Sequence, residues 1–218
     1  MISQCTQRVL VTCFASNVAR LETIAKAAHA CGRDVVLAGR SLQRFTEAAR
    51  ENGYLQDVPT FLDEDDAGYL PEDKCLVICT GSQGEPRAAL ARIAAGTHPR
   101  ISVSSGDTII FSSKIIPGNE IPIGRVHNEL ARRRVNVITE DDAFVHVSGH
   151  PNRDELMKMY GYIRPQISVP VHGETRHLHE HAKLAKACQV REAHVVHNGA
   201  LIRLGPGESG IIGEVPAG

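Results

Sequence analysis

The sequence predicts a layered α/β fold built around a largely parallel, doubly wound sheet. Short β-rich runs alternate with helical patterns along most of the 218 residues, as expected for strand–helix–strand crossover units. Apolar residues make up 42% and charged residues 22% of the chain, which is ordinary for a globular protein. A chain of this length buries one large core or two small ones, so we expect at most two domains.

The first half of the chain shows the alternation most clearly. RVLVTC (8–13) is an apolar run typical of a buried strand. A helix capped by Ser16 or Asn17 and ended by Gly32 should follow, because apolar residues recur at helical spacing, at Val18, Leu21, Ile24, Ala25 and Ala28. The same reasoning predicts strands at 34–39 and 75–81, helices at 41–52 and 86–95, and a solvated acidic loop at 63–74.

The second half repeats this order after the run DTIIFSS (107–113) and the loop PGNEIP. We expect a helix at 124–134, strands at 135–139 and 143–148, a helix at 152–162, a strand at 166–173, a helix at 174–188, and a hairpin of 193–199 with 200–205. The charged helix and the EDD turn that follows it indicate a domain boundary near 140. The predicted domains are therefore 1–140 and 141–218.

Charge and cysteine usage narrow the class of protein. Lys plus Arg number 24 against 25 Asp plus Glu, so a polyanion must be bound by a local basic patch. The six cysteines show no C-x-x-C pair and lie mostly in apolar runs, so we expect them reduced and buried. Neither a signal peptide nor a long apolar stretch is visible, which predicts a cytoplasmic protein with no membrane partner.

Two glycine- or hydroxyl-bearing loops follow strand ends in the first half. FASN (14–17) starts a helix, where free backbone N–H groups favour a phosphate, although a simple N-cap explains this motif alone. TGSQGEP (80–86) is a second candidate anion loop, but it matches neither Walker A nor G-x-G-x-x-G. Five arginines follow strand ends on the side of these loops: Arg20, Arg40, Arg44, Arg87 and Arg92.

The histidines concentrate in the last third, with eight of the 11 at or after position 146. His150 in HVSGHP and His172 in PVHGE are expected at neighbouring strand ends, where two imidazoles can converge as metal ligands or proton carriers. Ser148 and Gly149 would leave donors free for a phosphate. Structural histidines are the alternative interpretation. HLHEH (177–181) resembles a metal-ligand run, but its helical pattern and missing acidic ligand favour a solvated helix face.

Six segments, in this order, resemble the bacterial ribonuclease J family: TCFASNVARL, LAGRSL, CTGSQGEPRAALARIA, GDTIIFSSKIIPGNE, HVSGHPNRDEL and PVHGETRHLHEHAKLA. The family consists of metallo-β-lactamase nucleases with an inserted β-CASP domain. The resemblance covers nearly the whole chain. It implies a β-CASP doubly wound parallel-sheet domain at 1–140 and the C-terminal part of a metallo-β-lactamase αββα domain at 141–218.

The resemblance also implies an activity and roles for residues. The family cleaves RNA internally and degrades it 5′ to 3′, preferring a 5′-monophosphate, with water activated between two zinc ions. RNA would be the partner, and the full-length family forms homo-oligomers. His150 would assist catalysis and His172 would be a zinc ligand. RNA and phosphate contacts would come from Ala15, Ser16, Asn17, His146, Val147, Ser148, Gly149 and His150.

The chain departs from the family pattern at the metal site. The H-x-H-x-D-H run, the further His and Asp ligands and the D-S-T-type motif lie upstream of FASN in the family and are absent from these 218 residues. One histidine cannot hold a zinc pair. We therefore expect a truncated enzyme with no or trace nuclease activity alone and a tendency to aggregate or oligomerise. Two alternatives stay open: a non-catalytic RNA- or 5′-phosphate-binding module, and a β-CASP hydrolase with another substrate.

Overall fold

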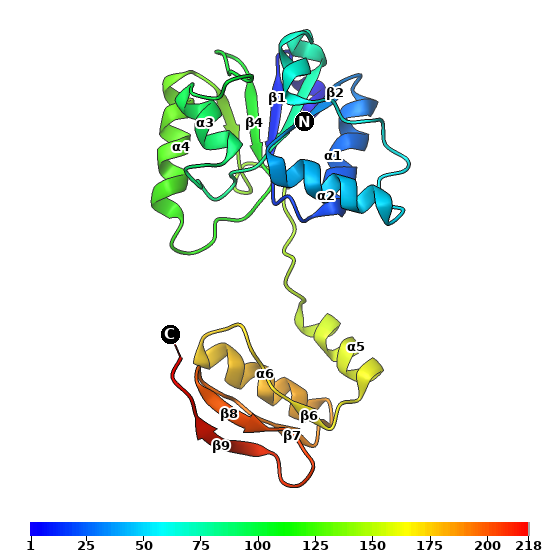
Figure 1. Ribbon diagram of the computed structural model, residues 1–218, viewed down its shortest axis with the longest axis vertical. Helices are drawn as coiled ribbons and strands as arrows, with labels where there is room; N and C mark the ends of the chain where they lie inside the picture. The colour runs from blue at the N-terminus through cyan, green and yellow to red at the C-terminus, as the bar shows by residue number, and fades with distance from the viewer. Residues whose placement is uncertain (218) are drawn as a thin grey trace. The chain divides into compact units, whose positions relative to one another are not determined.

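The computed structural model describes residues 1–217, which form two compact units. The first unit covers Met1–Val147, and the second begins at Ser148 (Figure 1). A five-stranded parallel sheet with helices on both faces makes up the first unit, whereas two helices and two small sheets make up the second. The predicted α/β class is confirmed. The expected domain boundary near 140 falls inside the first unit.

The sheet of the first unit has the strand order β2-β3-β1-β4-β5, and every neighbouring pair is parallel. Its strands are β1 (Val9–Thr12), β2 (Asp34–Ala38), β3 (Cys75–Cys79), β4 (Thr108–Phe111) and β5 (Asn136–Ile138). Every residue of β1, β3 and β4 is buried, because helices cover both faces of the sheet. A parallel bridge between Val36 and Leu62 extends the sheet beyond β2.

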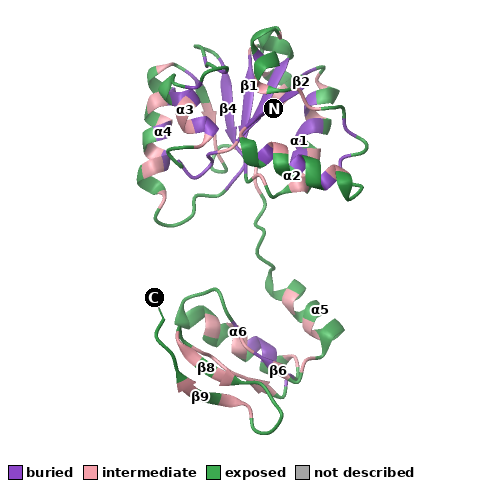
Figure 2. Cartoon of the chain, viewed as in Figure 1, coloured by how far each residue is buried: buried purple, intermediate pink, exposed green. Residues whose placement is uncertain are grey.

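Two helices pack on each face of this sheet: α1 (Val18–Ala30) and α2 (Arg40–Glu51) on one, α3 (Ala89–Ala95) and α4 (Glu120–Arg132) on the other (Figure 1). Successive strand residues point to opposite faces. Val9 and Val11 therefore pack against α1 and α2, while Leu10 packs against α3 and α4. Buried residues accordingly concentrate in the strands and on the inner helix faces (Figure 2).

The acidic stretch 63–74 is more ordered than the predicted loop. It holds two 3-10 helices, η2 (Glu64–Gly68) and η3 (Glu72–Lys74). A capping box between Asp63 and Asp66 starts η2, because each side chain accepts a hydrogen bond from the backbone N–H of the other end. This cap fixes the position of Glu64, which contacts the carboxyl end of β2.

The prediction of a strand at 143–148 is wrong. The Val145 carbonyl accepts hydrogen bonds from side chains, Arg20 Nη1 at 3.1 Å and Ser112 Oγ at 2.6 Å, and no strand pairs with it. Val145 packs instead against the core cluster beneath α1 and α2. The alternation of apolar residues at 143–148 misled the prediction, because an extended connection with one buried face shows the same pattern as a strand.

The second unit contains α5 (Arg153–Ile163) and α6 (Thr175–Ala187), which confirm the two predicted helices. The strands differ from the prediction: β6 (Ile167–Ser168) pairs in parallel with β7 (Glu192–Ala193), and β8 (Ala200–Arg203) forms a hairpin with β9 (Gly210–Glu214). The hairpin is therefore not the predicted pair of 193–199 with 200–205. No residue of α5 is buried, and Tyr162 and Ile163 are exposed.

The six cysteines are free, as the sequence predicts. Cys13, Cys75 and Cys79 are buried as expected, whereas the other three are partly exposed, contrary to the prediction. Burial raises the pKa of Cys13 and of Cys79 to about 12, so both thiols are protonated at neutral pH. Among residues 1–217, none of the helices is long and apolar enough to span a membrane.

Two histidines, the buried His98 and the half-buried His127, should make the stability of the first unit depend on pH. Burial lowers the pKa of His127 and of His98 below the usual 6.5, and the Nε2 atom of His127 lacks a hydrogen-bond partner among the described residues. The unfolded chain then binds protons that the folded chain excludes. Proton binding to the unfolded chain therefore destabilises the fold at low pH. The fold keeps its full stability above pH 6.5, the usual pKa of histidine, and loses stability as the pH falls below that value.

We therefore expect the free energy of unfolding to fall between about pH 7 and about pH 5.5, measured by denaturant unfolding followed by circular dichroism. His127→Leu replaces the imidazole by an apolar side chain of similar size beside Phe111. The centroids of the Phe111 and His127 rings lie 4.6 Å apart. The variant should show a weaker pH dependence than the wild type. Equal pH dependence in the two proteins would contradict a neutral, half-buried His127.

Candidate functional site

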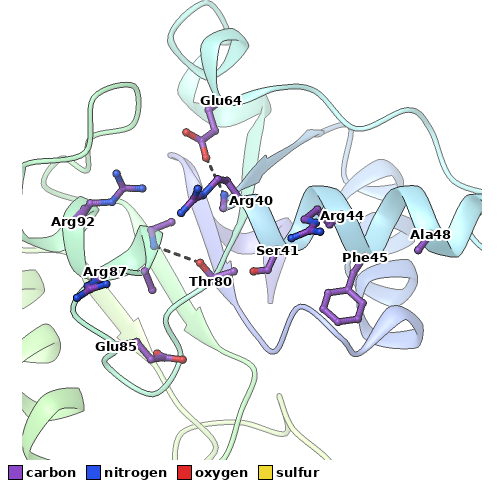
Figure 3. Close-up of a pocket in the computed structure, with 13 residues that line it drawn as sticks. Arg40, Ser41, Arg44, Phe45, Ala48, Glu64, Thr80, Glu85, Arg87 and Arg92 are labelled. Carbon is purple, nitrogen blue, oxygen red and sulfur yellow. Dashed lines mark hydrogen bonds between the residues drawn. The ribbon is translucent and has the colours of Figure 1, made fainter.

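The carboxyl ends of β2 and β3 form a crevice in the first unit. These strands are neighbours, yet the helices that follow them, α2 and α3, cover opposite faces of the sheet. Open α/β sheets bind ligands at such positions, because the two helices diverge and leave a gap above the strand ends. A pocket of about 1100 Å³ lies there, lined by the start of α2, the end of β3 and residues 85–92 (Figure 3).

Four arginines line this pocket, which we call the arginine pocket. Arg40 and Arg44 come from one face of α2, and Arg87 and Arg92 come from the other side (Figure 3). Within residues 1–217, the ion pairs that arginines make with carboxylates involve Arg100, Arg132, Arg176 and Arg191, and none of these four. The only acidic lining residues are Glu64 and Glu85, so the lining keeps a net positive charge.

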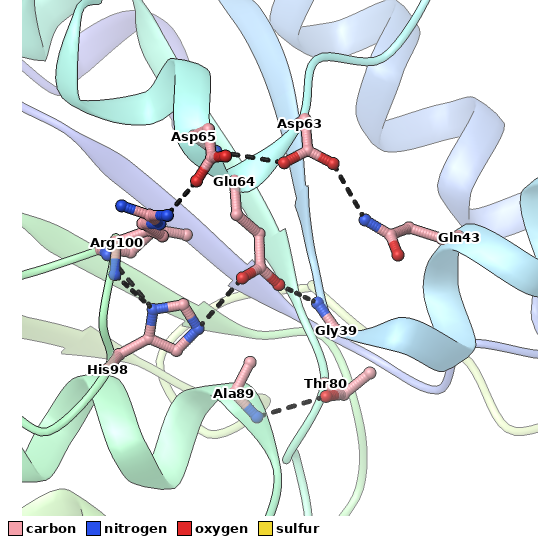
Figure 4. A network of polar contacts seen from close by, with 10 residues as sticks. Gly39, Gln43, Asp63, Glu64, Asp65, Thr80, Ala89, His98 and Arg100 are labelled. Atoms are coloured by element: carbon pink, nitrogen blue, oxygen red, sulfur yellow. Dashed lines mark hydrogen bonds and ion pairs between the residues drawn. The ribbon is translucent and has the colours of Figure 1, made fainter.

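Glu64 holds the N-terminus of α2 in place. Its carboxylate accepts a hydrogen bond from the Gly39 N–H at 2.8 Å and lies 3.6 Å from His98 Nε2 (Figure 4). His98 Nδ1 accepts the backbone N–H of Ile101 at 3.1 Å, so the proton of the neutral ring is on Nε2 and faces Glu64. Burial lowers the pKa of His98 and outweighs the opposing effect of Glu64.

Gly39 itself allows the close approach of β2 to β3 at this edge. Its φ is +126°, and a Cβ there would lie 2.7 Å from Thr80 Oγ1. Thr80 Oγ1 in turn accepts a hydrogen bond from Ala89 N at 3.4 Å (Figure 4). The first residue of α2 and the first turn of α3 are thereby held at fixed positions around the pocket.

The TGSQGEP turn is committed to contacts within the protein. Gln83 is buried, and its side-chain amide donates to the Lys114 carbonyl at 3.0 Å and accepts from Ile116 N at 3.0 Å. Glu85 accepts the Gln83 N–H at 3.0 Å. The turn therefore does not present Gln83 to an anion. It positions the segment that carries Arg87.

A second group of contacts joins the FASN loop to the HVSGHP segment through Arg20. Asn17 is the N-cap of α1, since its side chain accepts the Arg20 N–H at 3.1 Å. Arg20 Nη1 donates to Ser112 Oγ at 2.7 Å and to the Val145 carbonyl at 3.1 Å, and lies 3.3 Å from His146 Nδ1. Motif spacing did not reveal this bridging role of Arg20.

His146 is neutral in this arrangement. Arginine only donates, so His146 Nδ1 accepts and Nε2 carries the proton. Burial lowers the pKa of His146, and the nearby Arg20 lowers it further. Asn17, His146 and Val147 line one pocket of about 690 Å³ along α1, whereas Ala15 and Ser16 do not. The structure thus places Asn17 and His146 around one pocket, and Arg20 contacts both: its backbone N–H contacts Asn17 and its guanidinium contacts His146.

The remaining candidate residues lie in the second unit. The rings of His150 and His172 stack, with centroids 5.9 Å apart and an angle of 10° between their planes. Both residues are exposed, as are Ser148 and Gly149, and the Ser148 hydroxyl accepts the His150 N–H at 3.1 Å. Neither histidine ends a strand, because β6 stops at Ser168. Loops, and not strand ends, bring the two imidazoles together.

These residues alone do not fit a zinc site. Within residues 1–217, no group of three or more His, Cys, Asp or Glu side chains is placed to hold a metal ion. Two stacked imidazoles fall short of the three or four ligands that zinc takes. HLHEH lies within α6, as expected from its pattern, and His181 uses Nε2 to contact the Tyr160 hydroxyl at 3.0 Å.

Comparisons with known proteins match this architecture. Residues 6–130 match the family model described as Ribonuclease J, beta-CASP domain, and residues 134–197 match the one described as Zn-dependent metallo-hydrolase RNA specificity domain. Ribonuclease J of Sinorhizobium meliloti is 48% identical over 218 residues, which are 100% of this chain and 39% of the relative. Ribonuclease J of Mycolicibacterium smegmatis is 44% identical over 214 residues, 97% of this chain and 38% of the relative.

The relative from Synechocystis, also a ribonuclease J, is 38% identical over 221 residues, 100% of this chain and 34% of the relative. The chain therefore spans well under half the length of the curated relatives it matches. The family model covers more than half of the chain itself, including the whole of β1 to β4 and α1 to α3. The chain thus belongs to the ribonuclease J family and carries its β-CASP domain at residues 6–130.

Proposed function

We propose that this protein acts in RNA hydrolysis of the ribonuclease J type and that this chain contributes RNA-binding surface to it. The family membership and the RNA specificity named for residues 134–197 support the proposal. In this proposal, RNA is bound with a preference for a 5′-monophosphate, and cleavage proceeds both internally and from the 5′ end. Assembly into homo-oligomers and a cytoplasmic location stay predictions.

The observation that carries the proposal is the stacked, exposed pair of His150 and His172. Neither ring has a hydrogen-bond partner among the residues that the structure describes, so their nitrogen atoms are free for a ligand. The adjacent Ser148 and Gly149 offer a hydroxyl and a backbone N–H. An imidazole beside such donors binds a phosphate oxygen and transfers a proton near neutral pH. His150 is the residue that we assign to this role.

The role of His172 as a zinc ligand stays a prediction, because the two imidazoles alone do not fit zinc. When bound, zinc would supply a nucleophilic hydroxide to the family's reaction. The part assigned to this chain is the binding and orientation of the RNA phosphate. We expect the isolated chain to cleave RNA at trace level or not at all.

His150→Ala should abolish the preference for a 5′-monophosphate. Fluorescence anisotropy would compare two RNAs of one sequence, with a 5′-monophosphate and with a 5′-hydroxyl. We expect the wild type to bind the phosphorylated RNA more tightly and the variant to bind both equally, because a charge-assisted contact is lost. His179→Ala, an exposed histidine on α6, is the matched control. An unchanged preference in His150→Ala would contradict the assigned role.

The alternative function is a module that binds RNA without cleaving it. The absence of a group of three metal-binding side chains within residues 1–217 favours this alternative for the chain by itself. The two functions differ in a cleavage assay with added zinc. Zinc-dependent cleavage, even at trace level, that is lost in His150→Ala supports the enzyme, whereas RNA binding with no zinc-dependent cleavage supports the module for this chain.

A further inference from the structure

We propose that the arginine pocket is a nucleotide-binding site that holds phosphate between its arginines and a base against Phe45. The nucleotide would be part of an RNA strand or free in solution, since both present the same chemistry. The first source rests on the proposed RNA function, and the second does not. The lining of the arginine pocket shares no residue with the pocket beside His146.

The charge of the lining is the first argument. Four guanidinium groups face one space with two carboxylates, and Glu64 already uses its carboxylate on Gly39 N–H. Like charges that share a pocket repel one another, and an anion between them removes the repulsion. Arg92 Nε is buried and has no hydrogen-bond partner among residues 1–217. A phosphate oxygen at this position would satisfy a buried donor that the protein leaves unmet.

The composition of the lining is the second argument. Phe45 lines the pocket beside Arg44 and is 44% exposed, so its ring is accessible to a ligand in the pocket. Nucleobases stack on aromatic rings and on arginine planes, whereas an acidic peptide needs only the positive charge. The hydroxyls of Ser41 and Thr80 add polar groups of the kind that bind sugar and phosphate oxygens (Figure 3).

The position and size of the pocket are the third argument. The crevice between strands with diverging helices is where doubly wound sheets bind nucleotides, because strand-end loops and helix starts point into it. The pocket measures about 1100 Å³, above the range of about 300–1,000 Å³ that small-molecule pockets occupy. It therefore has room for a nucleotide together with a neighbouring phosphate of the same strand.

The test uses the whole chain and a single-stranded RNA with a 5′-hydroxyl, so that 5′-phosphate recognition does not contribute. Fluorescence anisotropy measures RNA binding at several salt concentrations. Calorimetry measures the binding of adenosine monophosphate and of inorganic phosphate. The pocket variant is Arg40→Gln with Arg87→Gln, both exposed positions. The control is Arg125→Gln with Arg132→Gln on α4, which removes the same charge outside the pocket. Circular dichroism checks that both variants fold.

We expect the pocket variant to bind RNA at least about tenfold more weakly than the control, since each charge-assisted contact is worth that much. The salt dependence of the logarithm of the binding constant should fall by about 1.4, as two phosphate contacts contribute about 0.7 each. Phe45→Ala should weaken binding about tenfold with little change in salt dependence, because stacking carries no charge.

The outcomes separate the two sources and the two proposals. If adenosine monophosphate binds in a pocket-dependent way and RNA does not bind, the site takes a free nucleotide and the RNA function fails. If RNA binds equally well to the pocket variant and to the control, the RNA function stands and this inference is overturned. Displacement by oligoglutamate, with unaltered binding in Phe45→Ala, also overturns it, because the site then recognises charge alone.

Discussion

Replacing Arg33 by methionine is expected to lower the free energy of unfolding by about 3–5 kcal/mol, because it removes a buried guanidinium and leaves the buried and part-buried carbonyls that it contacts without this donor. Arg33 is 5% exposed. Its guanidinium donates to four backbone carbonyls, those of Cys5 at 2.5 Å, Gln7 at 2.9 Å, Cys75 at 3.2 Å and Glu72 at 3.3 Å. One side chain thus joins the segment before β1 to the start of β3.

Denaturant unfolding followed by circular dichroism measures this loss. Arg132→Met is the matched control, since Arg132 is exposed on α4 and its ion pair within the described residues is with Glu129. Its replacement should cost no more than about 1 kcal/mol, as exposed ion pairs contribute little. Arg33→Lys should also be destabilised, because an ammonium group cannot reach four separate carbonyls. Equal losses at Arg33 and Arg132 would show that the carbonyl contacts do not stabilise the fold.

Gly84→Ala is expected to destabilise the first unit by about 3–5 kcal/mol, from backbone strain and a steric clash together. Gly84 has a φ of +77°, a backbone conformation that residues other than glycine rarely adopt. A Cβ at this position would lie 2.5 Å from the Pro122 carbonyl carbon and 2.7 Å from Ile123 N. These are backbone atoms of α4, so a side-chain movement cannot relieve the clash.

Gly53→Ala is the control for the strain alone. Gly53 has a similar φ of +81°, but nothing lies within 4 Å of the Cβ it would gain. It should cost about 1–2 kcal/mol, the penalty of the left-handed backbone. The two variants are compared by thermal and denaturant unfolding. Equal losses of unfolding free energy in Gly84→Ala and Gly53→Ala would contradict the close packing of the TGSQGEP turn against α4.

Most elements of the first unit could be predicted because local signals and tertiary packing agree there. Asn17 is a strong N-cap, and the apolar residues of α1 recur at the spacing that buries Leu21 and Ile24. The buried strands β1 and β3 are short apolar runs, as a parallel sheet covered on both faces requires. The sequence pattern and the packing point to one structure.

The second unit was harder to predict because its strands are short and little buried. β6 and β7 have two residues each, so their periodicity carries no information. The segment 193–199 has strand-like composition, yet after β7 ends at Ala193 the next strand is β8. The residues that pair with β8 lie at 210–214, beyond a loop that the alternation of apolar residues does not reveal.

The candidate site could be predicted only in part. The sequence singled out the four arginines of the arginine pocket as residues beyond strand ends, but it did not predict that they line one space. That fact depends on α2 and α3 leaving neighbouring strands toward opposite faces. Strand order decides it, and strand order is set by contacts distant in sequence. The bridging role of Arg20 depends on the same long-range placement of Ser112 beside α1.

The most direct test of RNA binding is the dissociation constant of the whole chain for 5′-monophosphorylated single-stranded RNA across a series of salt concentrations. We expect RNA to bind at low salt. The logarithm of the binding constant should fall linearly with the logarithm of salt concentration, with a slope of about −0.7 per phosphate contacted. DNA of the same sequence should bind more weakly where the 2′-hydroxyl is recognised. Failure to bind RNA even at low salt would contradict the proposal that this chain contributes RNA-binding surface to a ribonuclease J-type enzyme.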